Sequence, residues 1–342
     1  MIAAASVFAA VFTLVLPLAV FGTKGAASEK REETLLPPEQ TAAVETPLPS
    51  QTPPPRAAQE DKSRSVRVLM EDGTVLETDM SSYLWGVVAA EMPASFEEEA
   101  LKAQTAAART YTLWKALHNK AHPEANVCTD YTCCQAWISR EEAAEKWGDQ
   151  AEEYSRKVEE AVAATDGTVL YFDGQPIQAV FHSSSAGRTQ DAVTVWGSTV
   201  PYLTAVDTPE GEETPNYQTT AELSEEEVRA ALEALGCKLE EEPEKWLEGL
   251  SYSANGSVTS AQVGGVTLRG NVLRTALGLR SPSFTVSYGD KGFTFRVTGY
   301  GHGVGLSQYG ANALAKQGKT WREILSWYYS GVEFGDYDGP LT

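Results

Sequence analysis

The chain has 342 residues, of which 42% are hydrophobic and 9% aromatic. This composition is typical of a globular protein with room for one large or two medium domains. Lys and Arg number 27 against 47 Asp and Glu, so the formal net charge is −20. Nucleic-acid binding needs a basic surface, and the charge therefore argues against nucleic acid as a partner.

The chain begins with an apolar segment. Residues 2–21 carry no charge, and a run of about 20 residues can span a bilayer. The apolar core of a signal peptide is shorter, about 7–15 residues. The length favours a single-pass membrane anchor over residues 1–23, with a cleaved signal peptide as the alternative. Basic residues follow the run and none precedes it, which by charge alone places the rest of the chain in the cytoplasm.

A Pro-rich segment follows the apolar run. Residues 24–65 contain Leu-Pro-Pro-Glu, Thr-Pro-Leu-Pro and Thr-Pro-Pro-Pro-Arg, with few aliphatic residues and no aromatic ones. Such a segment cannot bury a core, and we expect a disordered, extended linker. The folded domain is then expected over residues 66–342, with a possible second lobe at about 206–294.

The folded region opens with a predicted β-hairpin. Residues 66–70 and 74–78 are strand-like and are separated by a Glu-Asp-Gly turn. An apolar run at 83–90 should be buried, and it ends in a single carboxylate, Glu91. Pro93 then breaks whatever precedes it. The pattern delivers one acid to the start of the next helix.

A capping-box pattern and a run of strong helix formers predict a helix over residues 96–118. Lys102 and Arg109 are seven residues apart, so they share one face of this helix. Burial beside apolar side chains raises the pKa of a carboxyl group, which makes Glu91 a candidate general acid. In the alternative, Glu91 is a buried acid that pairs structurally with Lys102 or Arg109.

A short cysteine-rich stretch follows this helix. His122, Cys128 and Cys134 recur at intervals of six residues, which suits a tetrahedral zinc site. A disulfide from Cys128 to one of the two later cysteines is the alternative, and a free buried thiol is the third. The fourth zinc ligand is open among Cys133, His118 and water.

The remaining pattern mixes helices and strands without regular alternation, so the fold class predicted is α+β rather than a doubly wound sheet. Cys237 stands alone and is expected to be a small buried apolar residue. In chain order, we expect a helix at 140–163, strands at 168–172 and 177–181, a helix at 222–236, strands up to Val297 and a helix at about 320–330.

Two polar motifs lie outside the predicted helices. The first is Phe-His-Ser-Ser-Ser-Ala-Gly-Arg-Thr at 181–189, which follows a predicted strand. Its hydroxyls could line a sugar or peptide cleft, or form a plain polar loop. A Ser–His nucleophile pair is disfavoured because adjacent strand residues point to opposite faces.

The second motif is Gly-rich and spans 299–315, with a helix expected to begin near Ser307. A Gly-rich turn into a helix can cradle an anion. The motif lacks the Lys of a P-loop and the glycine spacing of a dinucleotide fingerprint, so nucleotide binding is not expected. His302 is either a ligand contact or a satisfied buried histidine.

Three long segments in order carry a resemblance. They are Glu-Met-Pro from Glu91 with the helix after it, His-Ser-Ser-Ser-Ala-Gly-Arg-Thr with Trp-Gly and Pro-Tyr-Leu after it, and Gly-His-Gly-Val-Gly-Leu-Ser-Gln-Tyr-Gly-Ala. Over about 66–336, and in its anchor-plus-linker layout, the chain closely resembles the stage II sporulation protein D family. The resemblance implies a peptidoglycan lytic transglycosylase of endospore-forming bacteria, related to the amidase enhancer proteins that share the domain.

The resemblance also implies roles for individual residues. Glu91 is implied as the catalytic acid/base, with Lys102 and Arg109 supporting the site. One zinc, expected to be structural, is implied at His122, Cys128 and Cys134. Many relatives have His immediately before the last Cys, where this chain has Cys133. Substrate contacts are expected from the two polar motifs and the Pro-Tyr-Leu segment, namely His182, Ser183, Ser184, Ser185, Arg188, Tyr202, His302, Ser307, Gln308 and Tyr309.

The setting implied by the resemblance is the engulfment stage of sporulation. The chain would be held in the cell membrane by one span, with the catalytic domain outside the cytoplasm, in the space between the two membranes. This orientation opposes the weak charge signal. The implied partners are peptidoglycan glycan strands and stage II sporulation proteins P and M. The competing hypothesis is a non-catalytic peptidoglycan-binding enhancer of an N-acetylmuramoyl-L-alanine amidase.

Overall fold

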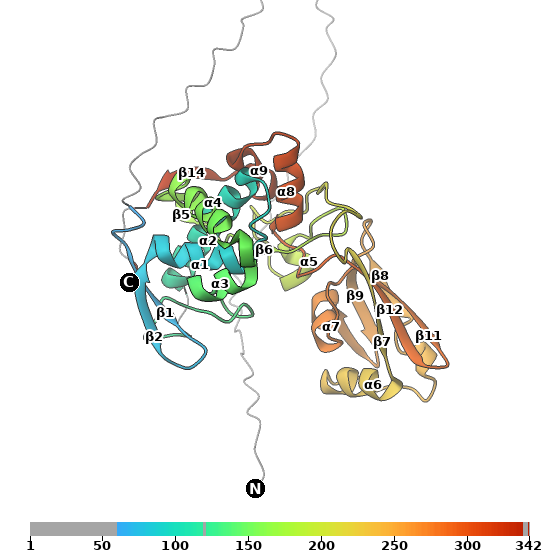
Figure 1. Ribbon diagram of the computed structural model, residues 1–342. Coiled ribbons are helices and arrows are strands. Elements are labelled where there is room, and N and C mark those ends of the chain that lie inside the picture. The colour runs from blue at the N-terminus through green and yellow to red at the C-terminus, as the bar shows by residue number, and fades with distance from the viewer. Residues whose placement is uncertain (1–59, 119–120, 338–340, 342) are drawn as a thin grey trace, which may run out of the picture. The chain divides into compact units, whose positions relative to one another are not determined.

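The structure is a computed structural model that describes residues 60–118, 121–337 and 341 (Figure 1). The anchor predicted at 1–23 and most of the linker predicted at 24–65 lie outside these residues. Within the described part of the chain, no helix is both long enough and apolar enough to cross a bilayer.

The α+β fold class is confirmed by a mixture of helices and several small sheets. The predicted hairpin is present, and its first strand also pairs in parallel with a short strand of the cysteine-rich stretch. The run at 83–90 is helical, so it presents its apolar side chains all round and is almost wholly buried. These first elements are β1 Ser65–Leu69, β2 Val75–Asp79, α1 Met80–Glu91, α2 Glu98–His118 and β3 Val127–Cys128.

The helix predicted at 140–163 is broken in two. Gly148 has φ 56°, a left-handed conformation that ends the first helix, and a 3₁₀ turn at Gly148–Gln150 leads into the second. The pieces are α3 Arg140–Trp147 and α4 Ala151–Ala164. Both contact α1, and α4 also contacts α2. Helix α1, which ends in Glu91, is therefore packed against α3 and α4.

The strands predicted at 168–172 and 177–181 are connected as a hairpin that turns at Asp173-Gly174, with positive φ at both residues. Its returning strand is much shorter than predicted. Residues beyond it leave the hairpin, and Phe181–His182 pair instead in parallel with Leu306–Ser307. The elements are β4 Thr168–Phe172, β5 Gln175–Pro176, β6 Phe181–His182, α5 Ala192–Trp196, β13 Leu306–Ser307, α8 Gln308–Lys316, α9 Trp321–Tyr328 and β14 Glu333–Asp336.

Buried side chains between Val228 and Val297 form a second hydrophobic core. The helix predicted at 222–236 is shorter and follows a strand, and the strands predicted up to Val297 are present. Two three-stranded antiparallel sheets, in the orders β10-β9-β8 and β11-β12-β7, supply this core with two helices. The elements are β7 Gln218–Leu223, α6 Glu225–Ala234, the 3₁₀ turn Pro243–Lys245, β8 Gly249–Tyr252, β9 Val258–Val263, β10 Val266–Arg269, α7 Gly270–Ala276, β11 Phe284–Gly289 and β12 Gly292–Thr298.

A buried ion pair ties the start of the described chain to α2. Arg109 Nη2 lies 2.5 Å from Asp61 Oδ2, and both side chains are 2% exposed. The Arg109 guanidinium also donates to the Thr168 carbonyl at 3.2 Å. Asp61 lies within the segment expected to be linker, so that segment contributes a buried charge to the core. Breaking a buried pair leaves an uncompensated charge.

We therefore expect truncation to be sensitive to a few residues. A chain beginning at residue 66 should unfold more easily than one beginning at residue 60, by about 3–5 kcal/mol, because it leaves Arg109 without Asp61. Urea unfolding followed by circular dichroism measures the difference. Asp61→Asn in the longer chain is the matched control and should lose most of the same stability. Equal unfolding midpoints for all three chains would contradict a structural role for the pair.

Candidate active site and metal centre

Glu91 is the last residue of α1, and its side chain reaches the cysteine-rich stretch. The backbone N–H of Ala136 donates to Glu91 Oε1 at 2.8 Å. Met92 caps the helix by donating its N–H to the Val88 carbonyl at 3.1 Å, and its extended backbone turns the chain toward α2. The buried helix α1 thus places the Glu91 carboxyl group at a fixed point between the cysteine-rich stretch and α2.

The electrostatics of Glu91 are dominated by desolvation. Burial raises the pKa of the carboxyl group. The Ala136 N–H, the Gln308 side-chain amide and the Lys146 ammonium oppose this shift without reversing it. No carboxylate of the described residues contributes to the shift. Glu91 is therefore an isolated acid whose proton is held more tightly than usual.

The cation beside Glu91 is Lys146, which sequence reasoning missed. Lys146 Nζ donates to the Ala89 and Ala90 carbonyls at 3.0 and 3.5 Å, so it caps the C-terminal end of α1. Partial burial lowers the pKa of Lys146, and the Glu91 charge partly offsets this. Lysines are common on exposed helices, and the sequence of α3 gives no signal that this one folds back onto α1.

The two cations predicted to support Glu91 make other contacts. Lys102 pairs with Glu99 at 2.7 Å and with Glu98 at 3.9 Å on its own helix. Arg109 pairs with Asp61. The shared helix face is real, yet neither side chain bonds to Glu91 among the contacts of the described residues. Their implied catalytic roles stay predictions.

The predicted metal ligands converge. One ligand atom from each of four residues lies within 4.8 Å of the others, in the set His122, Cys128, Cys133 and Cys134. His122 Nε2 is 3.3 Å from Cys133 Sγ, and the Cys133 and Cys134 sulfurs are 3.8 Å apart. All four cysteines of the chain are free thiols in the structure, and Cys237 is buried elsewhere, as expected. A His/Cys₃ cluster of this kind can bind a metal ion.

The metal cluster and the acid are joined by two residues of backbone. Ala136, the donor to Glu91, follows Cys134 by two positions. The next residues pack on α1 at Gly86, where a Cβ would lie 2.2 Å from Trp137 Nε1 and 2.7 Å from the Ile138 carbonyl oxygen. Glycine at this position allows the stretch to approach the helix. The cluster therefore positions the group that holds Glu91.

The two polar motifs meet through β6 and β13 and through their histidines. His182 Nδ1 donates to the Val304 carbonyl at 3.1 Å, so Nε2 accepts from Ser185 Oγ at 2.6 Å. Burial, and after it the neighbouring His302, lower the pKa of His182 to about 3. The imidazole is therefore neutral. Because Ser185 is only 4% exposed, this Ser–His pair joins loops and does not form an accessible nucleophile.

His302 is similarly neutral. Its Nδ1 accepts from the Val304 N–H at 3.1 Å, and burial together with the Arg274 charge lowers its pKa to about 4. Its ring lies 5.6 Å from those of His182 and Trp196. His182 is buried, and both of its ring nitrogens are hydrogen-bonded. His302 is partly buried, and for it both alternatives, a ligand contact and a satisfied histidine, stay predictions.

Glu210 joins both motifs from a third segment, and no sequence signal marked it. Its Oε1 accepts from the Ser185 N–H at 2.7 Å and from Ser307 Oγ at 2.5 Å. Thr208 donates to the other oxygen and contacts the Tyr328 hydroxyl at 2.6 Å. Ser307 is also the N-cap of α8. The buried carboxylate thus fixes the start of α8, whose first residue is Gln308.

The other residues predicted to contact substrate are Gln308, Tyr309, Tyr202 and Arg188. Gln308 approaches Glu91, and its buried Nε2 has no hydrogen-bond partner within the described residues. The Tyr309 N–H donates to the Ser183 carbonyl at 3.0 Å, and its ring packs on Phe96. Tyr202 and Arg188 make contacts with other residues. The Tyr202 hydroxyl accepts from the Gln178 N–H at 2.9 Å, and Arg188 pairs with Asp207 at 2.5 Å.

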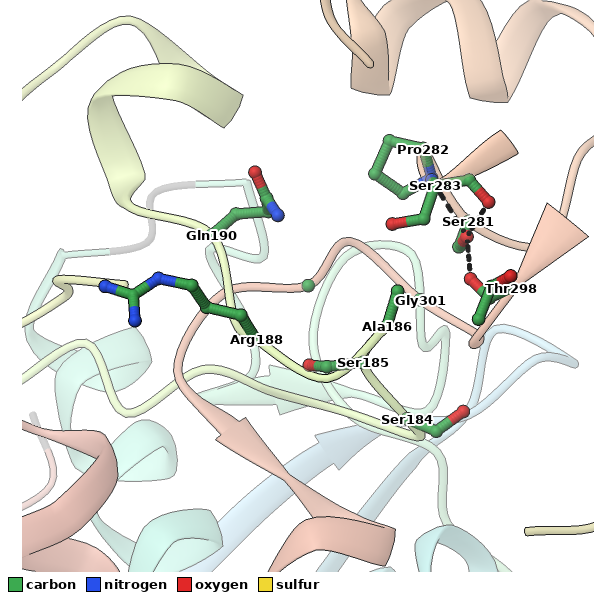
Figure 2. Close-up of a pocket in the computed structure, with 11 residues that line it drawn as sticks. Ser184, Ser185, Ala186, Arg188, Gln190, Ser281, Pro282, Ser283, Thr298 and Gly301 are labelled. Carbon is green, nitrogen blue, oxygen red and sulfur yellow. Dashed lines mark hydrogen bonds between the residues drawn. The ribbon is translucent and has the colours of Figure 1, made fainter. Parts of the chain in front are cut away.

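A small polar cavity lies where the first motif faces the second core (Figure 2). Its volume is about 10 Å³, which is about the space that one water molecule needs. A sugar does not fit in this volume, and the cavity is lined by residues of both polar motifs and by residues 281–283. Its lining includes Ser184, Ser185, Arg188, Gln190, Ser281 and Ser283.

Comparison of the sequence with known proteins shows the family to which this chain belongs. The family described as "Stage II sporulation protein" matches residues 71–172, which include Glu91 and the four clustered ligands. Stage II sporulation protein D of Bacillus subtilis is 37% identical over 274 residues, covering 77% of this chain and 76% of that protein. The chain belongs to the stage II sporulation protein D family.

Two further relatives extend the picture. Stage II sporulation protein D of Bacillus amyloliquefaciens is 35% identical over 265 residues, with 77% of this chain and 76% of that protein covered. The amidase enhancer of Bacillus subtilis is 29% identical over 309 residues, covering 74% of this chain but 40% of that protein. The domain of the stage II sporulation protein D family is thus similar to part of an enhancer.

The raised pKa of Glu91 predicts a stability difference with a definite sign. The unfolded carboxyl ionises near its usual pKa of about 4.3, whereas the folded one ionises at higher pH. The wild type therefore loses stability as the pH rises through the folded value. Glu91→Gln should melt at a similar temperature near pH 4 and at a higher temperature than the wild type at pH 8. Calorimetry at both pH values measures this.

The exposed Glu145 on α3 supplies the control. Glu145→Gln should follow the wild type at both pH values, since its carboxyl is solvated in either state. A Glu91→Gln protein that melts below the wild type at pH 8 would contradict the desolvation of the acid.

Proposed function

We propose that this protein is a peptidoglycan lytic transglycosylase that acts during sporulation. It would cleave the glycosidic bond between N-acetylmuramic acid and N-acetylglucosamine and leave 1,6-anhydromuramyl ends. The observation that carries the proposal is Glu91, a largely desolvated acid with a raised pKa and no carboxylate of the described residues among the groups that shift it. Such an environment raises the pKa of the carboxyl group and so favours the protonated form that a general acid requires.

The single acid favours this reaction over hydrolysis. Glycosidases that use water generally need two carboxylates, about 5–9.5 Å apart. One group suffices when an internal hydroxyl replaces water, because the same residue can act first as acid and then as base. Glu91 fits this second pattern, since its electrostatic neighbours are Lys146 and neutral donors.

The steps follow from the proton on Glu91. The carboxylic acid protonates the glycosidic oxygen as the bond to C1 of the muramyl sugar breaks, and positive charge develops on the ring. The resulting carboxylate removes the proton from the C6 hydroxyl of that sugar, and its oxygen bonds to C1. The acid is regenerated and water is not consumed. The Ala136 N–H holds the carboxyl group in one orientation through both transfers.

Groups near Glu91 can position the sugar. The unpartnered Gln308 Nε2 can donate to substrate or to the ionised Glu91 in the middle of the reaction. Tyr111 is half-buried, and burial, together with charges that include Glu91, raises the pKa of its hydroxyl. The Tyr111 ring lies 6.5 Å from the ring of Phe181 in an edge-to-face arrangement. Aromatic and amide side chains of this kind recur in ligand sites where they fix orientation.

The metal of the cluster is proposed to be zinc. Tetrahedral bonds of about 2.3 Å place two thiolate sulfurs about 3.8 Å apart, which equals the 3.8 Å between Cys133 and Cys134. His122, Cys128 and Cys134 would hold the ion with Cys133 as the fourth ligand. With no position left for water, its role is structural, and the chain's own residues perform the chemistry.

The cellular setting also remains part of the proposal. An anchor over 1–23 and a linker over 24–65 would hold the domain at the membrane, outside the cytoplasm, where peptidoglycan lies. Tethering raises the local concentration of enzyme at its substrate. Stage II sporulation proteins P and M are the proposed partners, on the strength of the family.

The second candidate function is a non-catalytic enhancer of an amidase. It is favoured by the 29% identity to the Bacillus subtilis amidase enhancer. The two functions differ in their dependence on Glu91. An enhancer needs its surface, whereas a transglycosylase needs the acid.

Glu91→Gln should therefore abolish cleavage of purified glycan strands while the protein stays folded. The amide can neither donate nor accept the proton, and loss of an acid/base group costs about 10²–10⁴ in rate. Mass spectrometry of the products measures both the rate and the 1,6-anhydro ends. Glu145→Gln should keep the wild-type rate. Reducing muramyl ends from the wild type would make the protein a hydrolase, and no wild-type cleavage would favour the enhancer.

Metal analysis tests the cluster directly. The protein purified without added zinc should contain one zinc per chain, and Cys133→Ser should bind it more weakly because one thiolate is lost. Replacing zinc with cobalt should give the absorption bands of a thiolate-rich tetrahedral site. Cys237→Ala removes a thiol outside the cluster and should leave metal content unchanged. A Cys128–Cys134 disulfide in metal-free native protein would refute the assignment.

A further inference from the structure

Lys146 of α3 supplies the charge that most affects Glu91 among the described residues. Its Nζ donates to the Ala89 carbonyl at 3.0 Å and to the Ala90 carbonyl at 3.5 Å. These are the two carbonyls that precede Glu91 at the C-terminal end of α1. The last carbonyls of a helix lack partners within it and carry the negative end of the helix dipole. The lysine therefore places a positive charge at the end of α1, where Glu91 lies.

Helix α3 lies beside α1 (Figure 1) and contacts it on both sides of Lys146. Near the start of α3, the Arg140 guanidinium carbon lies 4.3 Å from the centre of the Trp85 ring. At the end of α3, the Trp147 ring meets the same indole edge to face at 5.7 Å. Trp85 belongs to α1 and is buried. Because the helix that carries the lysine is fixed in this way, its two hydrogen bonds determine where the ammonium group lies.

Two effects oppose the ionised form of Glu91. Burial raises the pKa of its carboxyl group. The C-terminal end of α1 adds a negative potential, which also disfavours a carboxylate. General acid–base catalysis is most efficient when the pKa of the group lies near the working pH, so a carboxyl that ionises too reluctantly is a poor catalyst. The Lys146 charge opposes both effects.

The other groups around Glu91 supply no comparable charge. From α2, the Tyr111 hydroxyl has a raised pKa and is therefore uncharged near neutral pH. The cluster thiols act on Tyr111 as well, and none of them is among the groups that shift Glu91. From α8 and the cysteine-rich stretch come neutral donors, the Gln308 amide and the Ala136 N–H. Lys157 of α4 donates instead to a backbone carbonyl in the turn before α2.

Lys146 acts on Glu91 without a direct ion pair. It forms no salt bridge in the part of the chain that the structure describes. A direct ion pair would strongly favour the ionised carboxylate, whereas the first proton transfer needs the protonated acid. Because the ammonium group bonds to the carbonyls before the acid, its charge moderates the effect of burial, and the pKa of Glu91 stays raised.

We propose that Lys146 is a positioning residue for the reaction, whose ammonium group stabilises the carboxylate form of Glu91 between the two proton transfers. The inference rests on the proposed function. In the first transfer, the proton of Glu91 moves to the glycosidic oxygen, and a negative charge appears on a buried group at a helix end. In the second transfer, the carboxylate takes the proton of the C6 hydroxyl, and the charge disappears. Lys146 keeps its own proton throughout.

The experiment uses the full chain, purified in detergent, and glycan strands without stem peptides. The high-pH limb of kcat/KM reports the pKa of the essential acid in the free protein. Lys146 opposes the raised pKa of Glu91, so loss of its charge raises that pKa further. Lys146→Met should therefore move the high-pH limb to higher pH by about one pH unit, which corresponds to a factor of about ten in the ionisation constant. Below the limb, kcat should fall by up to about tenfold, with KM nearly unchanged.

Two variants serve as controls. Lys146→Arg keeps a positive charge and a donor at the same position, so its high-pH limb should stay close to that of the wild type. Lys157→Met removes a lysine that also donates to a backbone carbonyl, that of Phe96. Its charge is not among the groups that shift Glu91, so Lys157→Met should keep the wild-type limb.

Salt gives a second readout, because Lys146 is exposed to solvent and exposed charges are screened. Raising the ionic strength from about 0.01 M to about 1 M shortens the Debye length from about 30 Å to about 3 Å. The high-pH limb of the wild type should move towards that of Lys146→Met, whereas the limb of Lys146→Met should hardly move.

A purely structural role for Lys146 gives a different result. If the lysine only caps α1, Lys146→Met lowers the melting temperature and the rate while the high-pH limb stays in place, and that outcome would overturn the proposal. A limb that moves as far in Lys146→Arg as in Lys146→Met would overturn it too, because the charge would then not be the cause.

Failure of the proposed function is a separate outcome. If the wild type yields no anhydromuramyl ends, that function is wrong, and the effect of Lys146 on Glu91 is still measurable by nuclear magnetic resonance of carboxyl carbons in glutamate-labelled protein. The resonance that Glu91→Gln lacks identifies the acid. Its titration midpoint should lie at higher pH in Lys146→Met than in the wild type. Equal midpoints would refute the inference whether or not the protein cleaves glycan.

Discussion

The hydrogen bond from the Ala136 N–H to Glu91 is the contact on which the rest of the site depends. A carboxylate at the C-terminal end of a helix faces the negative end of the helix dipole, and burial adds to this penalty. Both effects favour the protonated acid. A single backbone donor fixes where that acid points, and this donor is carried by the stretch that also holds the His/Cys₃ cluster. The candidate acid and the cluster that could bind a metal are therefore mechanically coupled through this short stretch of backbone.

A second unit is built around β6 and β13. These two-residue strands join segments more than 120 positions apart, and Glu210 bonds to both from a third segment. The Gly-rich motif gains its conformation from these partners rather than from its own sequence. Because α8 begins at the same place, the carboxylate of Glu210 indirectly sets the position of Gln308 beside Glu91.

The sequence predicted the local elements well and the long-range partners poorly. Hairpins with Gly turns, the long helix α2 and the convergence of His122 with the cysteines follow from spacing alone. The helical state of α1 did not, because a run that is buried all round shows no periodicity. Lys146, Glu210 and Asp61 act through contacts made in three dimensions, and nothing in their neighbourhoods marks them. Arg109 was expected near Glu91 on the correct helix face, yet that face is long enough to serve two different partners.

Gly86 shows what such coupling means for attempts to improve the protein. Judged as part of a helix, a glycine is a weak point, and alanine would gain about 1 kcal/mol of helix propensity. In this fold the missing methyl group is the space occupied by Trp137 and Ile138. A consensus or propensity-based redesign would fill it, displace the stretch that carries Ala136, and release the acid while the helix itself became firmer. The single added carbon atom would then cost more in displaced packing at Trp137 and Ile138 than it gains in helix propensity.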